Sequence, residues 1–505
     1  MTTANPRDAD PVTLWERVVY WGLVALLFWA PLPFGSNRVW AVAVIVMWVA
    51  VFGAIWALGW ATGHCTVRTS FYRGRTALCL LALWAALLML QITPWPAAWL
   101  AVLSPGAAAA HATQHLYGSA DAASALQGVT PSIDASATQR HLLLSLALTG
   151  YFSLLLLVIT RTSRLKHFIL MMVVSGILYS VFALYAYFTG ASYLLFHEEV
   201  VHEMAKGPFM NRNHFGTYIE ICLACGVGLI VADFAPVQLT TGSQRLRWVL
   251  GVLLSAKARM RLMLIVMVIA LILTRSRMGN AAFFTALIAG GCVALLFMHA
   301  GWKTLVVFLT SMLILDAAVI GSWIGLDQVI KRVQQTPLAA VAAVDGKRPA
   351  DKGEESVEER TDQGISALAS VAAFPWFGTG AGSFEAMYPQ HKPPGYPFTL
   401  NHAHNDYIQF IVEGGILGAT LLFGLIVLAY RAVLQTMRNS ASTTRRGLAL
   451  GAFIGMLSSM IHASVEFALQ TPAIMLLFTA LLAVALLTQD RHPRARSAPA
   501  DPATP

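Results

Sequence analysis

Two arginines stand two residues apart in the segment TRSRMGN (274–280), directly after an apolar run of the chain. The guanidinium group of arginine can bind a phosphate group through two parallel hydrogen bonds. Arg275 and Arg277 are therefore candidates for binding a phosphorylated ligand. Residues two apart in a helix point in nearly opposite directions, so we expect only one of the two to face the ligand. The alternative is that both side chains extend to charged lipid headgroups.

Two histidines, His402 and His404, stand in NHAHND (401–406), directly before another apolar run. Histidine titrates near neutral pH and can take a proton from an attacking hydroxyl group. A His-x-His pair can also bind a metal, but no third ligand follows at a recognisable spacing. A third interpretation is a pair of polar residues at a membrane surface with no chemical role.

A third candidate, Arg360, lies in the charged stretch DKGEESVEERTD (351–362). Glu358 and Glu359 directly precede it, and a surface ion pair of this kind contributes little to stability. The local sequence therefore favours a solvated or structural role for Arg360.

Other polar residues interrupt the apolar runs, where a charged group is costly and usually faces a cavity or another helix. They are Glu220, Asp316, Glu413, His462 and Glu466.

The composition places these residues in a membrane protein. The chain has 505 residues, of which 57% are hydrophobic and 12% charged, and its mean hydropathy is +0.63. Soluble proteins carry about 45–50% apolar and about 25% charged residues. A chain this apolar needs lipid as part of its solvent. The first apolar run lacks a small-residue cleavage site, so we expect a retained helix and no signal peptide.

The apolar runs predict an all-α integral membrane protein with about 12 transmembrane helices. A helix needs about 20 mostly apolar residues to cross the hydrocarbon core, where every backbone amide must be paired. The expected spans are 14–31, 38–60, 76–92, 141–160, 167–188, 215–234, 260–274, 280–299, 303–324, 407–430, 447–467 and 471–488.

The distribution of lysine and arginine predicts the orientation. Twelve spans place both termini on one side, and if that side is the cytoplasm, 21 of the 34 basic residues lie there. Seven of the other 13 lie in 325–405, a segment too long for its charge to steer the topology. We therefore expect cytoplasmic termini. Because the net charge of +9 is spread over separate patches beside the membrane, it does not indicate a nucleic-acid partner.

The spans divide the chain into four parts. Residues 1–324 are expected to form an N-terminal bundle of about nine helices, with an outer loop at 93–140. Residues 325–406 form a long outer segment between the ninth and tenth helices, which includes the glycine-rich stretch FPWFGTGAGSF (374–384). Residues 407–488 form the C-terminal helices. Residues 489–505 form a cytoplasmic tail that we expect to be disordered.

One motif resembles a known family. His404-Asn405, followed by nine residues and then by Gly415 and Gly418, is similar to the signature of the O-antigen ligase and polymerase family of bacterial membrane glycosyltransferases. Further similarities extend over most of the chain. They are PLPFGS (31–36), GPFMNRNHFGTYI (207–219), Ser276-Arg277-x-Gly279, Arg360 with the stretch up to FPWFGTGAGSF, and IHASVEFALQTP (461–472).

The resemblance implies a multi-pass enzyme of the bacterial inner membrane whose active site faces the periplasm. Its donor would be a glycan on undecaprenyl pyrophosphate, and no metal or other cofactor would be needed. Arg277 and Arg360, assisted by Arg275, would bind the pyrophosphate, because cations stabilise the charge that develops on the leaving group. His404 would deprotonate the acceptor hydroxyl, with inversion at the anomeric carbon, and Asn405 or His402 would orient it.

The sequence leaves the acceptor open. A ligase would use lipid A-core, which the glycine spacing slightly favours, and a polymerase would use a growing lipid-linked glycan. A protein serine or threonine is a third acceptor. A transporter of polysaccharide or lipid is a different class, but transporters commonly show two similar halves, and the sequence shows no internal repeat.

Overall fold

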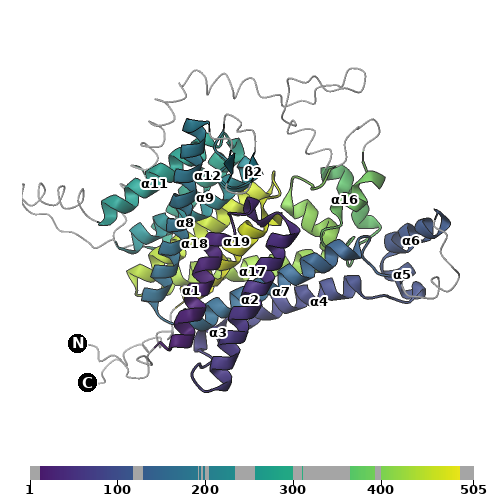
Figure 1. The fold of residues 1–505 in the computed structure, drawn as a ribbon, viewed down its shortest axis with the longest axis horizontal. Coiled ribbons are helices and arrows are strands. Elements are labelled where there is room, and N and C mark those ends of the chain that lie inside the picture. Colours follow the sequence, from purple (N-terminus) through teal and green to yellow (C-terminus); the bar gives the residue numbers. More distant parts are fainter. Residues whose placement is uncertain are drawn as a thin grey trace, which may run out of the picture.

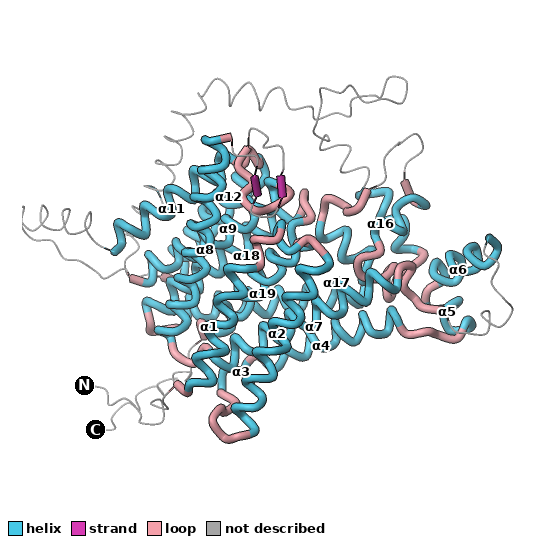
Figure 2. Tube along the Cα trace, in the orientation of Figure 1, coloured by secondary structure: helices cyan, strands magenta, loops and turns pink. Residues whose placement is uncertain are grey.

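The computed structural model describes residues 12–117, 129–190, 193–194, 197–198, 204–233, 256–298, 310, 364–392 and 400–489. Within these ranges the chain is a bundle of helices, with two very short strands, β1 (Tyr193–Leu194) and β2 (His197–Glu198) (Figures 1 and 2). The helices of the bundle are α1 (Leu14–Trp29), α2 (Val39–Ala61), α3 (Thr69–Arg73), α4 (Arg75–Ile92), α7 (Ala135–Val158), α8 (Thr162–Thr189), α9 (Arg212–Ala232), α11 (Ala256–Leu273), α12 (Arg277–Phe297), α17 (Asp406–Asn439), α18 (Thr443–Ala463) and α19 (Pro472–Leu487).

The expected membrane class is confirmed, but the number of crossings is confirmed only in part. Eight helices in the described ranges are long and apolar enough to cross a membrane, namely α2, α4, α7, α8, α9, α12, α17 and α18. The expected first and last spans form shorter helices of 16 residues each, α1 and α19. The expected ninth span, 303–324, lies outside the described residues except for residue 310. Twelve crossings therefore stay a prediction.

The loop expected at 93–140 contains two helices of its own, α5 (Ala97–Leu103) and α6 (Pro105–Tyr117). Figure 1 shows them at the far end of α4, away from the other helices. Part of the long segment after α12 is also described, and it forms short turns and α16 (Phe384–Met387). The other residues of this segment, 299–309, 311–363 and 393–399, lie outside the described residues.

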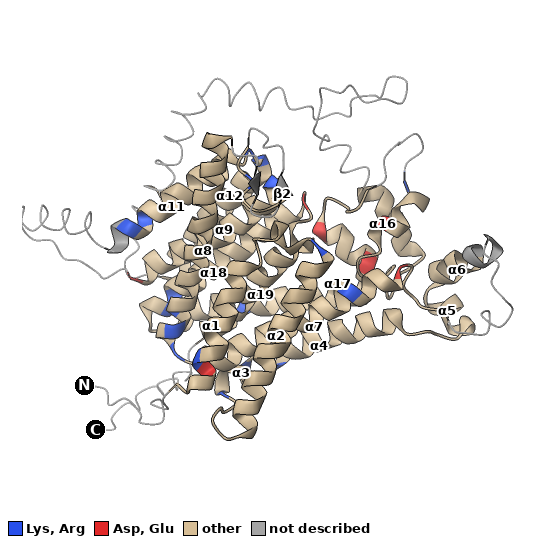
Figure 3. Cartoon of the chain, viewed as in Figure 1, with Lys and Arg blue, Asp and Glu red and all other residues tan. Residues whose placement is uncertain are grey.

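The long helices of the bundle run roughly along one another, so the bundle has two ends (Figure 1). At one end, Ser70 Oγ donates to the Leu156 carbonyl at 2.7 Å, and Lys166 Nζ lies 2.5 Å from Asp233 Oδ1. These contacts join the last turns of α7 and α9 to the beginnings of α3 and α8. Many lysines and arginines gather here (Figure 3), and we call this the basic end. We call the opposite end, where α9, α12 and α17 begin, the site end.

The centre of the bundle is α9, which is buried from His214 to Ala232 and packs against α18. Three glycines of α18, each four residues from the next, allow the two backbones to approach closely. A Cβ on Gly447 would lie 2.3 Å from the Ala232 nitrogen, and one on Gly451 would lie 2.8 Å from the Ala224 carbonyl oxygen. This contact fixes the position of α18, whose last residues lead into the candidate site.

Helix α17 is interrupted at Gly415, where φ is 64° and ψ is −170°. Such a break leaves backbone groups without helical partners, and in a membrane protein these must be satisfied by other protein groups. The glycine-rich stretch supplies them. Ile416 N donates to the Pro375 carbonyl at 2.9 Å, and Thr379 N donates to the Val412 carbonyl at 2.9 Å. The stretch FPWFGTGAGSF is therefore packed into the break of α17.

Candidate functional site

His404 lies in the turn that precedes α17, and its backbone has a φ of 49°, which is rare for a residue with a side chain. Its Nδ1 lies 3.5 Å from Oε1 of Glu466. The His404 side chain is 20% exposed and that of Glu466 is 1% exposed. The imidazole thus has access to solvent, while the carboxylate behind it is enclosed. Strained backbone held in place by surrounding structure often occurs at functional sites.

Three imidazole rings surround the ring of Phe467. His402 stacks on it, with centroids 4.2 Å apart and an interplanar angle of 14°. His404 meets it edge-on at 4.9 Å and 88°, and His214 at 4.7 Å and 89°. Both arrangements are favourable for aromatic rings. Phe467 therefore fixes the planes of both histidines of the NHAHND turn.

The turn that carries Glu466 is joined to α9 and to the start of α17. The Asn213 side-chain amide donates to Oε2 of Glu466, and the Asp406 backbone N–H donates to the Glu466 carbonyl at 3.2 Å. The Asp406 carboxylate accepts hydrogen bonds from Leu469 N at 3.0 Å and from Gln470 Nε2 at 3.1 Å. Asp406 is buried. It therefore links the beginning of α17 to the turn that follows α18.

Asn405 caps α17. Its Oδ1 accepts a hydrogen bond from Ile408 N at 3.1 Å, and its Nδ2 donates to the Ser464 carbonyl at 2.7 Å. A side-chain oxygen at this position satisfies a backbone N–H of the first helical turn. Both polar side-chain atoms of Asn405 are therefore hydrogen-bonded to the backbone. Any effect of this residue on an acceptor would act through the position of its neighbour His404.

His402 is held by Gln409. The Gln409 amide nitrogen lies 3.0 Å from His402 Nδ1 and 3.1 Å from Glu413 Oε1, while its oxygen accepts from Ala403 N at 3.2 Å. His402 Nδ1 also lies 3.3 Å from the Gln409 amide oxygen, so this nitrogen donates or accepts according to the tautomer. Burial lowers the pKa of His402 to about 4, against a smaller opposing effect of the Gln409 hydrogen bond. His402 is therefore neutral near pH 7.

Glu413 extends this network to the glycine-rich stretch. Its carboxylate accepts hydrogen bonds from Gly382 N at 2.9 Å and from Phe384 N at 3.3 Å. Gln91 of α4 donates to the Glu413 carbonyl at 2.8 Å and accepts from Ala381 N at 3.2 Å. The polar residues Glu413 and Gln91 thus connect α17 and α4 through the stretch that fills the helix break.

The arginine turn, which we define as residues 274–279, joins α11 to α12. Ser276 caps α12 by accepting a hydrogen bond from Gly279 N at 3.2 Å. Arg275 is half-buried and has a φ of 55°, whereas Arg277 is the first residue of α12 and is exposed. A helix N-terminus attracts anions through its free N–H groups and its dipole. At Arg277 the positive charge of the guanidinium group therefore adds to the attraction of the helix N-terminus for anions.

The arginine turn rests on a buried pair of polar side chains. His462 Nδ1 lies 2.9 Å from Glu220 Oε1, and Ser458 Oγ donates to Glu220 Oε2 at 2.5 Å. A Cβ on Gly279 would lie 2.9 Å from Glu220 Oε1, which shows that the turn packs directly on this pair. His462 is one turn before Glu466 along the chain. The arginine turn and His404 are therefore at the same end of the bundle.

Two residues named from the sequence cannot be placed. Arg360 and Asp316 lie outside the described residues. His402 and His404 belong to no group of three His, Cys, Asp or Glu residues that could hold a metal within the described part of the chain. The absence of a metal stays a prediction.

Several residues of the network were missed at the level of the sequence. Phe467, His214 and Gln409 lie in or beside the motifs named above. Their residue types and spacing did not mark them as candidates for the site. Gln409 and Gln91 carried one usable signal, because each is an amide within an otherwise apolar helix. Phe467 carried none, because a phenylalanine in an apolar chain is expected everywhere.

The helices and the site end define a class, namely a multi-pass α-helical membrane protein with a histidine–carboxylate pair and an arginine turn at one end. Residues 262–423 match the O-antigen ligase family. The match confirms the family resemblance over this segment of the chain. The matched segment includes Arg275, Arg277, His402 and His404, and it ends before Glu466. No curated protein matches the chain.

Proposed function

We propose that this protein transfers a glycan from an undecaprenyl-pyrophosphate carrier to an acceptor hydroxyl, with lipid A-core as the acceptor. The observation that carries the proposal is the pairing of His404 with Glu466 at the same end of the bundle as Arg275 and Arg277. The first pair can accept a proton, and the second can bind a diphosphate. An O-antigen ligase needs both functions close to one surface.

His404 acts as the general base. The acceptor hydroxyl oxygen attacks the anomeric carbon of the donor glycan and forms the new glycosidic bond. The bond from that carbon to the pyrophosphate oxygen breaks, its electron pair leaves with undecaprenyl pyrophosphate, and the hydroxyl proton moves to the imidazole. Attack opposite to the leaving group inverts the anomeric configuration. The Glu466 carboxylate, 3.5 Å from Nδ1, stabilises the imidazolium that results.

The arginines stabilise the leaving group. Negative charge grows on the pyrophosphate oxygen as the bond breaks, and fixed cations aimed at that charge lower the barrier. Arg277 is suited to this by its position at the beginning of α12, and Arg275 assists from the preceding turn. We assign the same role to Arg360. This chemistry needs no metal, so chelation with EDTA should leave transfer unchanged.

The orientation follows from the basic end. Lysines and arginines concentrate on the cytoplasmic side of bacterial membrane proteins, and the described basic end includes Arg68, Arg164 and Lys166. We therefore place this end in the cytoplasm with both termini, and the site end in the periplasm. The membrane is then the inner membrane, in whose outer leaflet the lipid-linked donor is presented.

The acceptor is tested by the lipopolysaccharide of a deletion strain. Loss of a ligase should leave full-length polymer on the lipid carrier and lipid A-core without O-antigen. Loss of a polymerase, the second candidate, should instead give a single repeat unit on lipid A-core. A normal lipopolysaccharide with missing protein-linked glycan would indicate a protein hydroxyl as acceptor. Transfer by the purified protein without an ion gradient excludes a transporter.

A further inference from the structure

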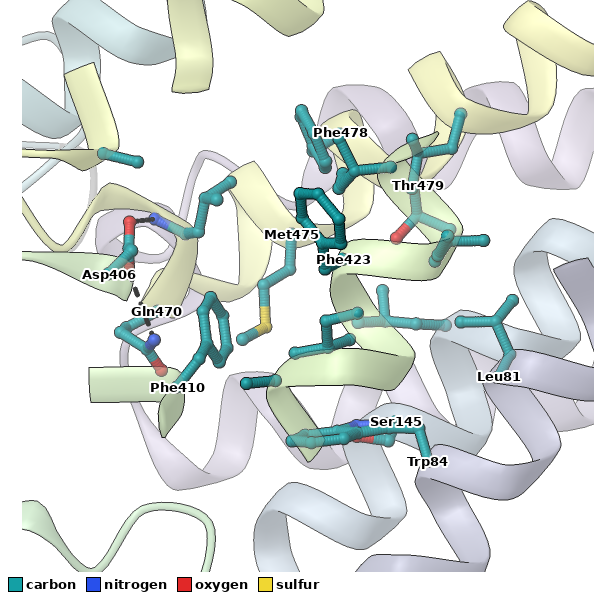
Figure 4. A pocket seen from close by; sticks show the side chains of 18 of the residues that line it. Leu81, Trp84, Ser145, Asp406, Phe410, Phe423, Gln470, Met475, Phe478 and Thr479 are labelled. Atoms are coloured by element: carbon teal, nitrogen blue, oxygen red, sulfur yellow. Dashed lines mark hydrogen bonds between the residues drawn. The ribbon is translucent and has the colours of Figure 1, made fainter. Parts of the chain in front are cut away.

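A cavity of about 520 Å³ lies between α4, α7, α17, α18 and α19 (Figure 4). Binding sites for small molecules commonly measure about 300–1,000 Å³, so its size suits a ligand. Its walls are almost entirely apolar. They include Leu81, Trp84, Leu148, Phe410, Ile426 and Phe478.

The cavity opens sideways toward the membrane. Tyr407, Phe423 and Val427 line it, and they are 50%, 69% and 45% exposed. All three belong to α17, one of the helices suited to span the membrane. An apolar opening on a membrane-spanning helix faces lipid, so the occupant can enter from the bilayer.

The cavity and the arginine turn lie on opposite faces of α18. Ser458 and His462 of α18 contact Glu220, on which the arginine turn packs. Leu457 and Met460, from the other face of the same helix, line the cavity. His404 contacts the turn that follows α18. The proposed base therefore lies beside the end of the helix that separates the two.

The polar end of the cavity is unsuited to a phosphate group. It is formed by Asp406, Gln470, Glu413 and His141, and Figure 4 shows Asp406 hydrogen-bonded to Gln470 beside Phe410. Among the described residues that line the cavity there is no lysine or arginine. Carboxylate groups accept hydrogen bonds from sugar hydroxyls, and amide groups both accept from and donate to them. A diphosphate instead requires cations.

We propose that this cavity holds a fatty acyl chain of the lipid-anchored acceptor, while the donor pyrophosphate binds at the arginine turn on the other face of α18. The inference rests on the proposed function, because it assigns the two lipid-linked substrates to opposite faces of α18, beside the end of which His404 lies. It adds the location and the chemical class of the acceptor anchor.

Lipid retention tests the proposal. The full chain is placed in phospholipid nanodiscs with either lipid A-core or undecaprenyl pyrophosphate, and native mass spectrometry measures how much lipid stays bound. Ala419→Phe on α17 and Leu148→Trp on α7 each fill the cavity from a different helix. Ala57→Phe is the matched control, because Ala57 is exposed on α2. Retention of lipid A-core should fall about tenfold or more in both cavity variants, and change less than about twofold in the control.

Two results would overturn the proposal. Unchanged retention of lipid A-core in either correctly folded cavity variant would show that the cavity holds no acceptor chain. A selective loss of undecaprenyl pyrophosphate would assign the cavity to the donor. The variant Arg277→Gln tests the proposed donor site independently of the cavity. If that variant keeps its donor retention, the assignment of the arginine turn fails, while the lipid A-core result for the cavity stands independently.

Discussion

Oε1 of Glu466 lies 3.5 Å from Nδ1 of His404. The two residues belong to separate turns, since His404 precedes α17 and Glu466 follows α18 along the chain. Both turns are held by neighbouring groups. Asn405 donates to the Ser464 carbonyl, and Asp406 accepts from Leu469 N. The pair is thus oriented by backbone contacts that do not themselves involve the imidazole. Substitution of either partner should therefore alter the chemistry more than the fold.

His404→Ala should nearly abolish transfer and leave the amount of membrane-inserted protein unchanged. A histidine base contributes about 10²–10⁴-fold to a rate, and the His404 side chain is 20% exposed, so its removal leaves no large cavity in the core. The measurement is glycan transfer from lipid-linked donor by purified protein, together with an immunoblot of the membranes. Activity at the wild-type level would show that His404 is not the base.

Glu466→Gln should lower the rate by about 10²-fold, because a neutral amide cannot stabilise the imidazolium as a carboxylate does. Glutamine keeps the size of the side chain and can still accept a hydrogen bond from Asn213. The double variant with His404→Ala should be no slower than His404→Ala alone, because groups that act as a unit are not additive. Fully additive losses would separate Glu466 from the proton transfer.

Arg277→Gln should reduce transfer by about 10²–10³-fold, the usual loss when one group that stabilises the developing charge is removed. Arg277→Lys should recover part of the rate, since an ammonium supplies charge without the two parallel hydrogen bonds. Arg38→Gln is the matched control, because Arg38 lies beside the ring of Phe34 at the same end, where α2 begins. Equal losses in Arg38→Gln and Arg277→Gln would indicate a general effect of surface charge.

The sequence predicted elements and candidate residues better than it predicted how they are connected. Apolar runs locate helices because backbone amides in the hydrocarbon core must be paired within the segment. The described helices follow the expected spans closely. The sequence placed His404 directly before an apolar run and Arg277 in the turn after another, and the structure has Arg277 as the first residue of α12. By contrast, the contacts of Phe467 with three histidines depend on how the turn after α18 folds back on α17. Nothing in the local sequence encodes that packing.

The glycine-rich stretch shows the same limit. The stretch stands out in the sequence by its glycines, but its partner, the break of α17 at Gly415, could not be predicted. The Gly415 position is part of an apolar run that reads as one continuous helix. Only the structure shows that Pro375 and Thr379 supply the missing hydrogen bonds.

Gly378→Ala should therefore destabilise the protein. Gly378 has a φ of 70°, and a Cβ there would lie 2.4 Å from the Glu413 carbonyl, which is backbone and cannot rotate away. Strained backbone alone costs about 1–3 kcal/mol, and the clash adds to it. Gly63→Ala is the matched control, since Gly63 has a φ of 78° but open space around it. The apparent Tm of the purified protein should fall clearly more for Gly378→Ala, and equal shifts would contradict the packing described here.

His402 should make the protein less stable as the pH falls below about 6.5. Its pKa is about 4 in the folded protein because it is buried, against about 6.5 in an unfolded chain. Between these values the unfolded state binds more protons, so stability increases with pH, by at most about 1.4 kcal/mol per unit, and levels off above about 6.5. The titratable groups that influence its pKa are His404, His141 and Glu466.

We expect His402→Gln to flatten the dependence of the apparent Tm on pH between 4.5 and 6.5, whereas a change at the exposed His64 should not. An unchanged slope in His402→Gln would mean that this imidazole is already protonated in the folded protein, and that its stacking on Phe467 does not require the neutral form.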